Sequence, residues 1–341
     1  MEVKSMACEE KKNLRFGIVG CGMIANVHAQ ALRSLEGVIL AGVADARKES
    51  AEAFAEKYRI AVYENYESML ADGEIDAVCV CTPSGFHAEN TLAALRAGKH
   101  VAVEKPIAMT AEEADEIIRT AKECEKLVTV ISQMRFATDV IFLKDAIDTG
   151  KLGTLKMCDL YMKYWRDGAY YHSSPWKGNR ALDGGVLMNQ GIHGVDLLRH
   201  LIGGATVVGS ISDRLTHKIE SPDTALALLR YDCGALGVIE ASTATYPGFE
   251  MRLEIIGERG YALFLDNHLE KLVIEGEEMA LPEEEHVSDG TAHDPTAVGF
   301  QKHARQLQNF ADAICGEAQL MVDAEAGRGA VALILDIYNE K

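Results

Sequence analysis

The sequence predicts an α/β protein in which a doubly wound parallel sheet is followed by an α/β domain with a large, mostly antiparallel sheet. Length is the first observation, because 341 residues are enough for about two domains. In the first half, short Val- and Ile-rich runs alternate with helical patterns. After residue 150 the β-rich runs instead follow one another directly. We therefore expect a flexible tail at 1–13, a first domain at 14–137 and a second at 138–341.

Five apolar runs are the expected strands of the first sheet: LRFGIVG at 14–20, VILAGVAD at 38–45, IDAVCVCT at 75–82, HVAVEK at 100–105 and LVTVISQ at 127–133. Helices are expected between them, for example at 47–58 and 86–97. A further helix begins after Thr110, which forms a capping box with Glu113. Strands that alternate with helices indicate a parallel sheet covered by helices.

The second half contains seven β-rich runs, at 156–165, 206–217, 223–232, 234–245, 249–258, 260–266 and 271–276. Asp232-Cys233-Gly234 predicts a hairpin between two of them. One helix is expected at about 184–202. Two more, at about 299–315 and 323–339, end the chain and can pack back on the first domain.

Net charge excludes some partners. The chain has 34 Lys and Arg against 52 Asp and Glu, which gives −18, and such a field repels nucleic-acid phosphates and anionic membranes. No run of 18 apolar residues occurs, so no membrane span is expected. The eight cysteines show no CxxC or framework spacing, which favours reduced thiols and a cytoplasmic protein.

The first motif is a glycine-rich turn between a strand and a helix. Gly20-Cys21-Gly22-Met23-Ile24-Ala25 reads GxGxxA, where Gly20 permits a tight turn, Gly22 lets the backbone approach a pyrophosphate and Ala25 lets the helix pack closely. The amide groups of that helix would face the anion. A glycine turn without a ligand is the alternative.

An acidic residue in the right place supports dinucleotide binding. Asp45 ends the second expected strand, twenty residues after Ala25, where its carboxylate can accept hydrogen bonds from a ribose 2′-hydroxyl and would repel a 2′-phosphate. This favours NAD. Arg47 and Lys48 are close enough to keep NADP possible.

The second motif is Glu104-Lys105-Pro106, at the end of the fourth expected strand. Ligands of open α/β sheets bind beyond the carboxyl ends of the strands, so Lys105 could hydrogen-bond a reacting hydroxyl and favour its deprotonation. A solvated lysine is the alternative. The end of the preceding strand supplies further residues that could line the same cleft, namely Thr82, Pro83 and His87.

The third motif lies in the helix expected at 184–202. At helical spacing Asn189, His193, Asp196 and His200 share one face, which on a lone helix would be its solvated side. The glycines around it (184, 185, 191 and 194) make a poor surface helix, and we expect something to approach its backbone closely. His193 has the side chain suited to general base catalysis near neutral pH.

In this order, the glycine turn, Asp45, TPSGFH, AGKHVAVEKP and GIHGVDLL resemble the Gfo/Idh/MocA family over about residues 14–340. The resemblance implies a Rossmann domain, NAD(P) in the cleft and oxidation of a secondary hydroxyl on a sugar, sugar derivative or cyclitol. It also implies that Lys105 polarises the hydroxyl, that His193 is the acid/base and that Glu104 lies near the nicotinamide ribose.

One departure concerns Asn189, at a position where many family members carry Asp. Asn can orient a hydroxyl but cannot stabilise an imidazolium by charge, so we expect a lower pKa for His193. The motif MNQGIH is more similar to that of members that act on nucleotide sugars or oxidise glycosides at C3.

An aromatic-rich segment nearby is expected to contact the substrate, with core packing as the alternative. Its residues are Tyr164, Arg166, Tyr170 and Trp176.

Two other functions stay open from the sequence. A redox-neutral enzyme would keep NAD tightly bound and act on glycosides, and a non-catalytic sensor would only bind NAD or a sugar. Lys105 and His193 argue against the sensor. No metal site is expected, since His286, His293 and His303 lack ligand spacing. A large sheet with one uncovered face predicts a homodimer or homotetramer through the second domain.

Overall fold

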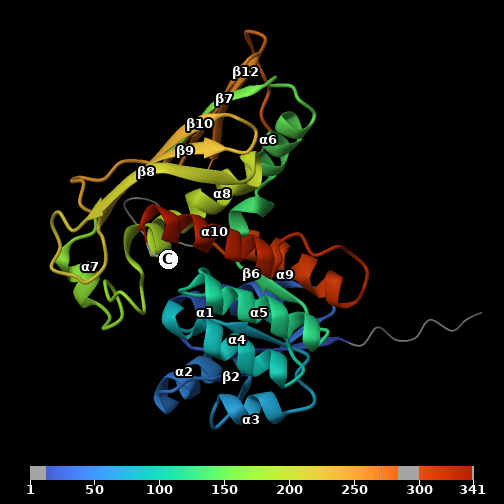
Figure 1. Cartoon of the computed structure of the whole chain (residues 1–341). Coiled ribbons are helices and arrows are strands. Elements are labelled where there is room, and N and C mark those ends of the chain that lie inside the picture. The colour runs from blue at the N-terminus through green and yellow to red at the C-terminus, as the bar shows by residue number, and fades with distance from the viewer. Residues whose placement is uncertain (1–12, 267, 283–298, 340–341) are drawn as a thin grey trace, which may run out of the picture.

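The computed structural model of the chain describes residues 13–266, 268–282 and 299–339 (Figure 1). It contains two sheets, with α9 (Gln301–Ile314) and α10 (Ala324–Ile337) between them. All of the predicted tail except residue 13 lies outside the described residues. Within the described ranges, no helix is long and apolar enough to cross a membrane.

The first sheet is parallel throughout and has the order β3-β2-β1-β4-β5-β6. Its strands are β1 (Leu14–Val19), β2 (Val38–Ala44), β3 (Ala61–Val62), β4 (Ala77–Val80), β5 (His100–Val103) and β6 (Val128–Val130). Its helices are α1 (Met23–Ser34), α2 (Lys48–Tyr58), α3 (Tyr66–Ala71), α4 (His87–Arg96) and α5 (Ala111–Glu123), with short turns η1 (Ser84–Phe86) and η2 (Gln133–Phe136). The predicted doubly wound sheet is confirmed, and its strand order reverses between β1 and β4.

The second sheet has eight strands in the order β14-β13-β12-β11-β7-β10-β9-β8. They are β7 (Leu155–Lys163), β8 (Ala205–Asp213), β9 (Thr224–Tyr231), β10 (Leu236–Ser242), β11 (Arg252–Gly257), β12 (Gly260–Leu265), β13 (His268–Ile274) and β14 (Glu277–Glu278). Only the β7–β10 pair is parallel, so the predicted mostly antiparallel sheet is confirmed. The helical segments here are α6 (Thr138–Asp148), α7 (Gly168–His172), the π-helical η3 (Val186–Gly191) and α8 (Ile192–Ile202).

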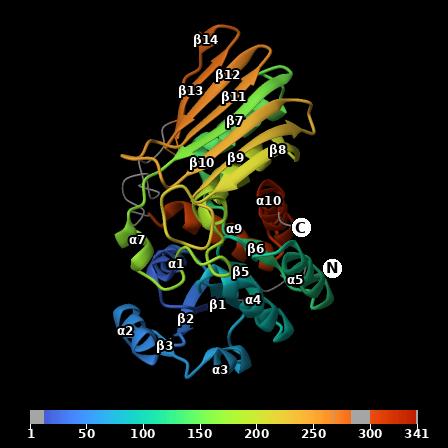
Figure 2. The ribbon, with the colours of Figure 1, turned by 60° about the vertical axis from the view of Figure 1, so that its left-hand side comes forward.

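The helices cover one face of this second sheet, as Figure 2 shows. In β9, Ala225, Ala227 and Leu229 are buried, whereas Leu226 and Leu228 between them are exposed. Because successive side chains of a strand point to opposite faces, the face that no helix among the described residues covers carries apolar side chains.

The last two helices connect the two sheets. In α9, the ring of Phe310 packs edge-on against Phe16 of β1 at 6.2 Å between centroids, and the side-chain amide of Gln306 donates to the Val130 carbonyl at 2.8 Å. A Cβ on Gly327 of α10 would lie 2.6 Å from the Val130 side chain. The C-terminal segment therefore packs tightly against the carboxyl end of β6, beside the cleft.

Candidate active site

The glycine-rich turn has the shape of an anion cradle. Gly20 has φ of +89°, and a Cβ there would lie 2.8 Å from the Cys81 backbone, so only glycine fits. At Gly22 a Cβ would meet no atom within 4 Å, which leaves the backbone open to a ligand. No side chain caps α1, which begins at Met23. Its first amide groups are therefore available to a pyrophosphate, and the turn fits a dinucleotide.

Asp45 is held at the edge of this cradle. Its carboxylate accepts hydrogen bonds from the backbone amides of Cys21 at 2.7 Å and Arg47 at 2.8 Å. The Arg47 side chain lies largely in solvent, with Nε 3.9 Å from Asp45. The Asp45 carboxylate is thus fixed directly beside the glycine turn, in the position from which it is expected to bind the ribose of NAD.

His87 is engaged within the protein. Its Nδ1 lies 2.6 Å from the Pro106 carbonyl oxygen and its Nε2 2.8 Å from the Thr82 carbonyl oxygen, and the ring is buried. It thereby ties the loop after β4 to the loop after β5. Pro83 directly precedes the turn η1 in the loop after β4. As cofactor contacts, these three residues remain predictions.

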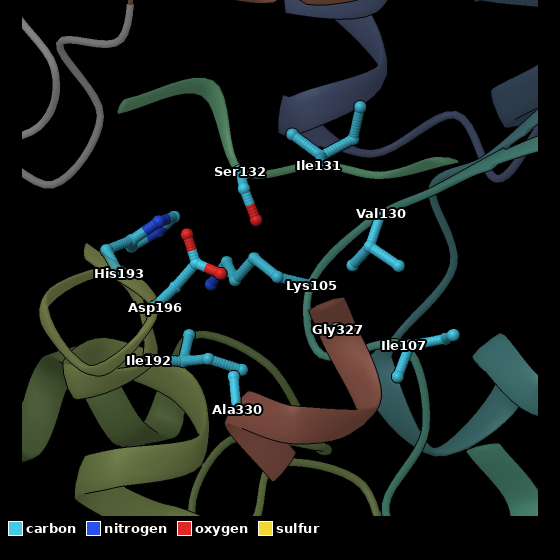
Figure 3. A pocket seen from close by; sticks show the side chains of 10 residues that line it. All are labelled: Lys105, Ile107, Val130, Ile131, Ser132, Ile192, His193, Asp196, Gly327 and Ala330. Atoms are coloured by element: carbon cyan, nitrogen blue, oxygen red, sulfur yellow. The ribbon is translucent and has the colours of Figure 1, made fainter. Parts of the chain in front are cut away.

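Lys105 and His193 line the same pocket although Lys105 follows β5 of the parallel sheet and His193 lies on α8, which packs against the second sheet. Nζ of Lys105 donates to the Asn189 carbonyl oxygen at 2.9 Å. Lys105, His193, Ser132 and Asp196 line one pocket, and Figure 3 shows their polar atoms pointing toward one another. The polar face predicted for 184–202 is consequently an internal face directed at the end of β5.

Burial determines the charge states of this pair. It lowers the pKa of His193 to about 3, and the nearby Lys105 charge acts in the same direction. Burial also lowers the pKa of Lys105, against the charges of Glu104 and Asp183, which raise it. The imidazole is therefore neutral at physiological pH and can accept a proton.

Behind Lys105, Glu104 belongs to a buried network. Its Oε1 lies 2.8 Å from Nε2 of His28 and 3.9 Å from Nε2 of His303. Burial alone would raise the pKa of Glu104, but the hydrogen bond and charge of His28 lower it to about 2. Although the three groups lie within 4.8 Å of one another, the direct His28–Glu104 bond uses the facing atoms, and we interpret the cluster as a buried ion pair. His286 and His293 lie outside the described residues.

An ion pair joins the His193 helix to η2, which follows β6 of the parallel sheet. Nε and Nη2 of Arg135 donate to the two carboxylate oxygens of Asp196 at 2.8 and 2.5 Å. Both side chains are 8% exposed. Paired charges at this burial are strongly interdependent, so this contact fixes α8 relative to the end of the parallel sheet.

Aromatic rings and cations gather beside Gln190, which follows Asn189. The buried Arg166 guanidinium stacks over Tyr164 at 5.1 Å and over Tyr170 at 5.6 Å, measured to ring centroids. Nζ of Lys177 lies 3.9 Å from the Tyr170 centroid. The Tyr170 hydroxyl accepts from Nε2 of Gln190 at 2.7 Å, which links this group to the residue after Asn189.

Comparison with known proteins shows the family to which the chain belongs. Residues 14–132 match the oxidoreductase family with an NAD-binding Rossmann fold, and residues 140–263 match the GFO/IDH/MocA C-terminal domain. The scyllo-inositol 2-dehydrogenase (NAD(+)) of Bacillus subtilis is 30% identical over 72% of each chain. The chain belongs to the Gfo/Idh/MocA family.

Two further relatives cover nearly all of this Gfo/Idh/MocA protein. The D-glucoside 3-dehydrogenase of Escherichia coli is 29% identical over 95% of this chain and 94% of its own. The WlbA dehydrogenase of Bordetella pertussis, solved with NADH and UDP-GlcNAcA, is 29% identical over 96% of each chain with a TM-score of 0.84. The chain is an NAD-dependent oxidoreductase that acts on a CH–OH group, as sugar and cyclitol dehydrogenases of the family do.

Two glycines near His193 in this Gfo/Idh/MocA chain lie close to other parts of the protein. A Cβ on Gly185 would lie 2.6 Å from the Pro222 carbonyl oxygen, and one on Gly194 would lie 2.7 Å from the Leu160 side chain. The close approach expected at these two glycines is thus explained by packing of the chain on itself.

Sequence reasoning missed four polar residues of the site: His28, Arg135, Asp183 and His303 as a partner of Glu104. A signal existed for His28, because a histidine in the otherwise Ala-rich inner face of α1 needs a buried partner.

Trp176, one of the expected substrate residues, lies half-buried near Lys177, with its ring centroid 5.9 Å from Nζ.

Proposed function

We propose that this NAD-dependent dehydrogenase oxidises a secondary hydroxyl of a sugar, sugar derivative or cyclitol with His193 as acid/base and Lys105 as its partner. The observation that carries the proposal is the meeting of Lys105 and His193 in one pocket, with His193 neutral because burial lowers its pKa to about 3. A binding protein needs neither group, which favours an enzyme over a sensor.

The proposed chemistry divides between the two side chains. The ammonium of Lys105 donates to the substrate hydroxyl oxygen and stabilises the alkoxide that forms there. Neutral His193 takes the hydroxyl proton as the C–O bond becomes a carbonyl. Gly20, Gly22 and Asp45 would hold NAD, which would accept the hydride that leaves the same carbon. The two residues thus control the oxygen end of the reacting bond.

A substrate screen tests this function. Purified protein is mixed with NAD or NADP and inositols, glycosides or UDP-sugars, and NADH is followed by absorbance. For an active substrate, Lys105→Ala and His193→Ala should each lower kcat by a factor on the order of 10³ with little change in NAD binding. Unchanged turnover in both variants would refute the assignment. Glycoside cleavage without net NADH would indicate the redox-neutral alternative.

An acidic sugar is a more specific candidate substrate. Arg166 and Lys177 place two cations around Tyr170 in a chain whose net charge is −18, and the WlbA relative was solved with UDP-GlcNAcA. A carboxylate would find both partners there. A larger kcat/KM for a uronate-containing sugar than for its neutral counterpart would support this candidate, and the reverse order would favour a neutral sugar.

The face of the second sheet that no helix of the described ranges covers supports a homodimer or homotetramer. Apolar side chains in an exposed row, including Leu226, Leu228 and Val208, suit a face that a second copy covers. Leu228→Asp should lower the mass measured by light scattering. A cytoplasmic location is supported by the cysteines, since none of the seven in the described ranges forms a disulfide.

A further inference from the structure

A carboxylate reaches Asn189 from six residues earlier in the chain. Nδ2 of Asn189 donates to Oδ1 of Asp183, and the Gly178 amide donates to Oδ2 at 3.0 Å. Asp183 is 2% exposed. Because both carboxylate oxygens accept a hydrogen bond, the orientation of the group is fixed.

The two glycines after Asp183 make this contact possible. Gly184 and Gly185 have φ of +72° and +83°, a conformation that residues with a Cβ rarely adopt. They lead the chain into η3, whose fourth residue is Asn189. The sequence Asp-Gly-Gly therefore returns the backbone so that the carboxylate meets the side chain of Asn189.

Lys105 contacts the same asparagine from its other end. Nζ donates to the Asn189 backbone carbonyl at 2.9 Å while Asp183 holds the side-chain amide. The charge of Asp183 raises the pKa of Lys105 against the effect of burial. The other nearby carboxylate, Glu104, is already paired with His28.

We propose that Asp183 is a positioning residue that supplies, from outside the usual helical spacing, the negative charge that Asn189 lacks. It orients Asn189 and keeps the ammonium of Lys105 available to the substrate hydroxyl. This inference rests on the catalytic role proposed above for Lys105.

The surroundings of Asp183 make its charge sensitive to pH. Burial raises the pKa of Asp183 to about 6, although hydrogen bonds from Gly178 and Asn189 and the charge of Lys105 lower it. The other titratable groups that it influences are Lys177, Tyr170 and Tyr171. Below about pH 6 protonation removes the negative charge that Asp183 places beside Lys105, whereas the charge of Glu104 remains because its pKa is about 2.

Exchange of the two side chains tests the proposal. Asp183→Asn should lower kcat between tenfold and a hundredfold and remove the loss of activity below pH 6. Asn189→Asp alone places two carboxylates in contact, which also lowers activity. The double variant D183N/N189D restores one carboxylate and one amide, and should recover activity to within about threefold of wild type. A double variant no more active than D183N, although folded, would overturn the proposal.

A second measurement needs no substrate. Competitive labelling of Lys105 with acetic anhydride at different pH values, read by mass spectrometry, gives its pKa. The value should fall by about one unit in Asp183→Asn, the size expected for loss of a neighbouring opposite charge, and return in the double variant. An unchanged value in D183N would overturn the charge effect.

A matched control separates position from burial. Asp159 of β7 is also buried, and its Oδ1 accepts from the Val238 amide at 2.9 Å. Asp159→Asn should affect thermal stability but neither the Lys105 pKa nor the pH profile. Lys105→Ala is measured with the same substrate. Full activity of Lys105→Ala would refute the proposed function, whereas an inactive Lys105→Ala beside an unaffected Asp183→Asn would refute this inference alone.

Discussion

The two catalytic side chains are supported in different ways. Lys105 follows β5 directly, and the carboxylate before it, Glu104, is bonded from inside the first domain by His28. His193 stands on α8, which the Asp196–Arg135 ion pair links to η2, directly after the β6 edge of the parallel sheet. The strand end places Lys105, whereas an ion pair between α8 and η2 helps to place His193.

The charged groups around the two side chains differ as well. Lys105 has carboxylates on two sides, Glu104 and Asp183, which both favour its charged form. His193 feels a net effect of burial and of the Lys105 charge, and its pKa is about 3. The site therefore pairs a lysine, whose charge the two carboxylates favour against the effect of burial, with a neutral imidazole that can accept a hydroxyl proton.

The largest effect is expected when the ion pair between Arg135 and Asp196 is broken. Arg135→Met leaves the Asp196 carboxylate buried without its bidentate partner, and the free energy of unfolding should fall by about 3 kcal/mol. Because α8 loses its link, kcat should fall more than affinity for NAD. Denaturant unfolding and NAD titration measure the two effects.

An exposed ion pair provides the control for Arg135→Met. Arg328 of α10 contacts Asp115 of α5 through two hydrogen bonds at 3.0 and 3.2 Å, and both side chains are exposed. Arg328→Met should change stability little, as exposed pairs do. Equal losses in both variants would show that the Arg135 contact has no special role in placing His193.

A smaller effect is expected behind Lys105. His28→Gln removes the charged donor to Glu104, and the free energy of unfolding should fall by about 2 kcal/mol. His303→Gln is the matched control, because Nε2 of His303 lies 3.9 Å from the same oxygen, beyond hydrogen-bond distance. Its effect should be clearly smaller in the same denaturant titration. A larger loss in His303→Gln would reassign the partner of Glu104.

The difference between the two halves also explains what the sequence could predict. The ends of β1, β2 and β5 carry motifs within a few residues, so Gly20, Asp45 and Lys105 could be placed by reasoning on parallel strands. The fold class followed from the same alternation of strands and helices. His193 was found because helical periodicity groups it with Asn189 and Asp196.

Partners from distant segments gave no such pattern. Arg135 and Asp196 are 61 residues apart, and His28 and Glu104 are 76 apart, so only the folded chain brings them together. Asp183 escaped notice for another reason, since the positive φ of Gly184 and Gly185 breaks the helical spacing that would have linked it to Asn189.

The effect that is smallest per pH unit concerns the pH dependence of stability that His193 confers. The pKa of His193 is lowered from 6.5 to about 3 in the folded chain, so the unfolded chain binds the extra proton between these values. Its contribution to stability is therefore complete above pH 6.5 and is lost as pH falls toward 3, by at most about 1.4 kcal/mol per pH unit. The melting temperature of His193→Gln should fall less steeply below pH 6.5 than that of the wild type. Replacement of the exposed His172 by Gln should leave the slope unchanged, and an equal slope in His193→Gln would mean that the imidazole is charged beside Lys105.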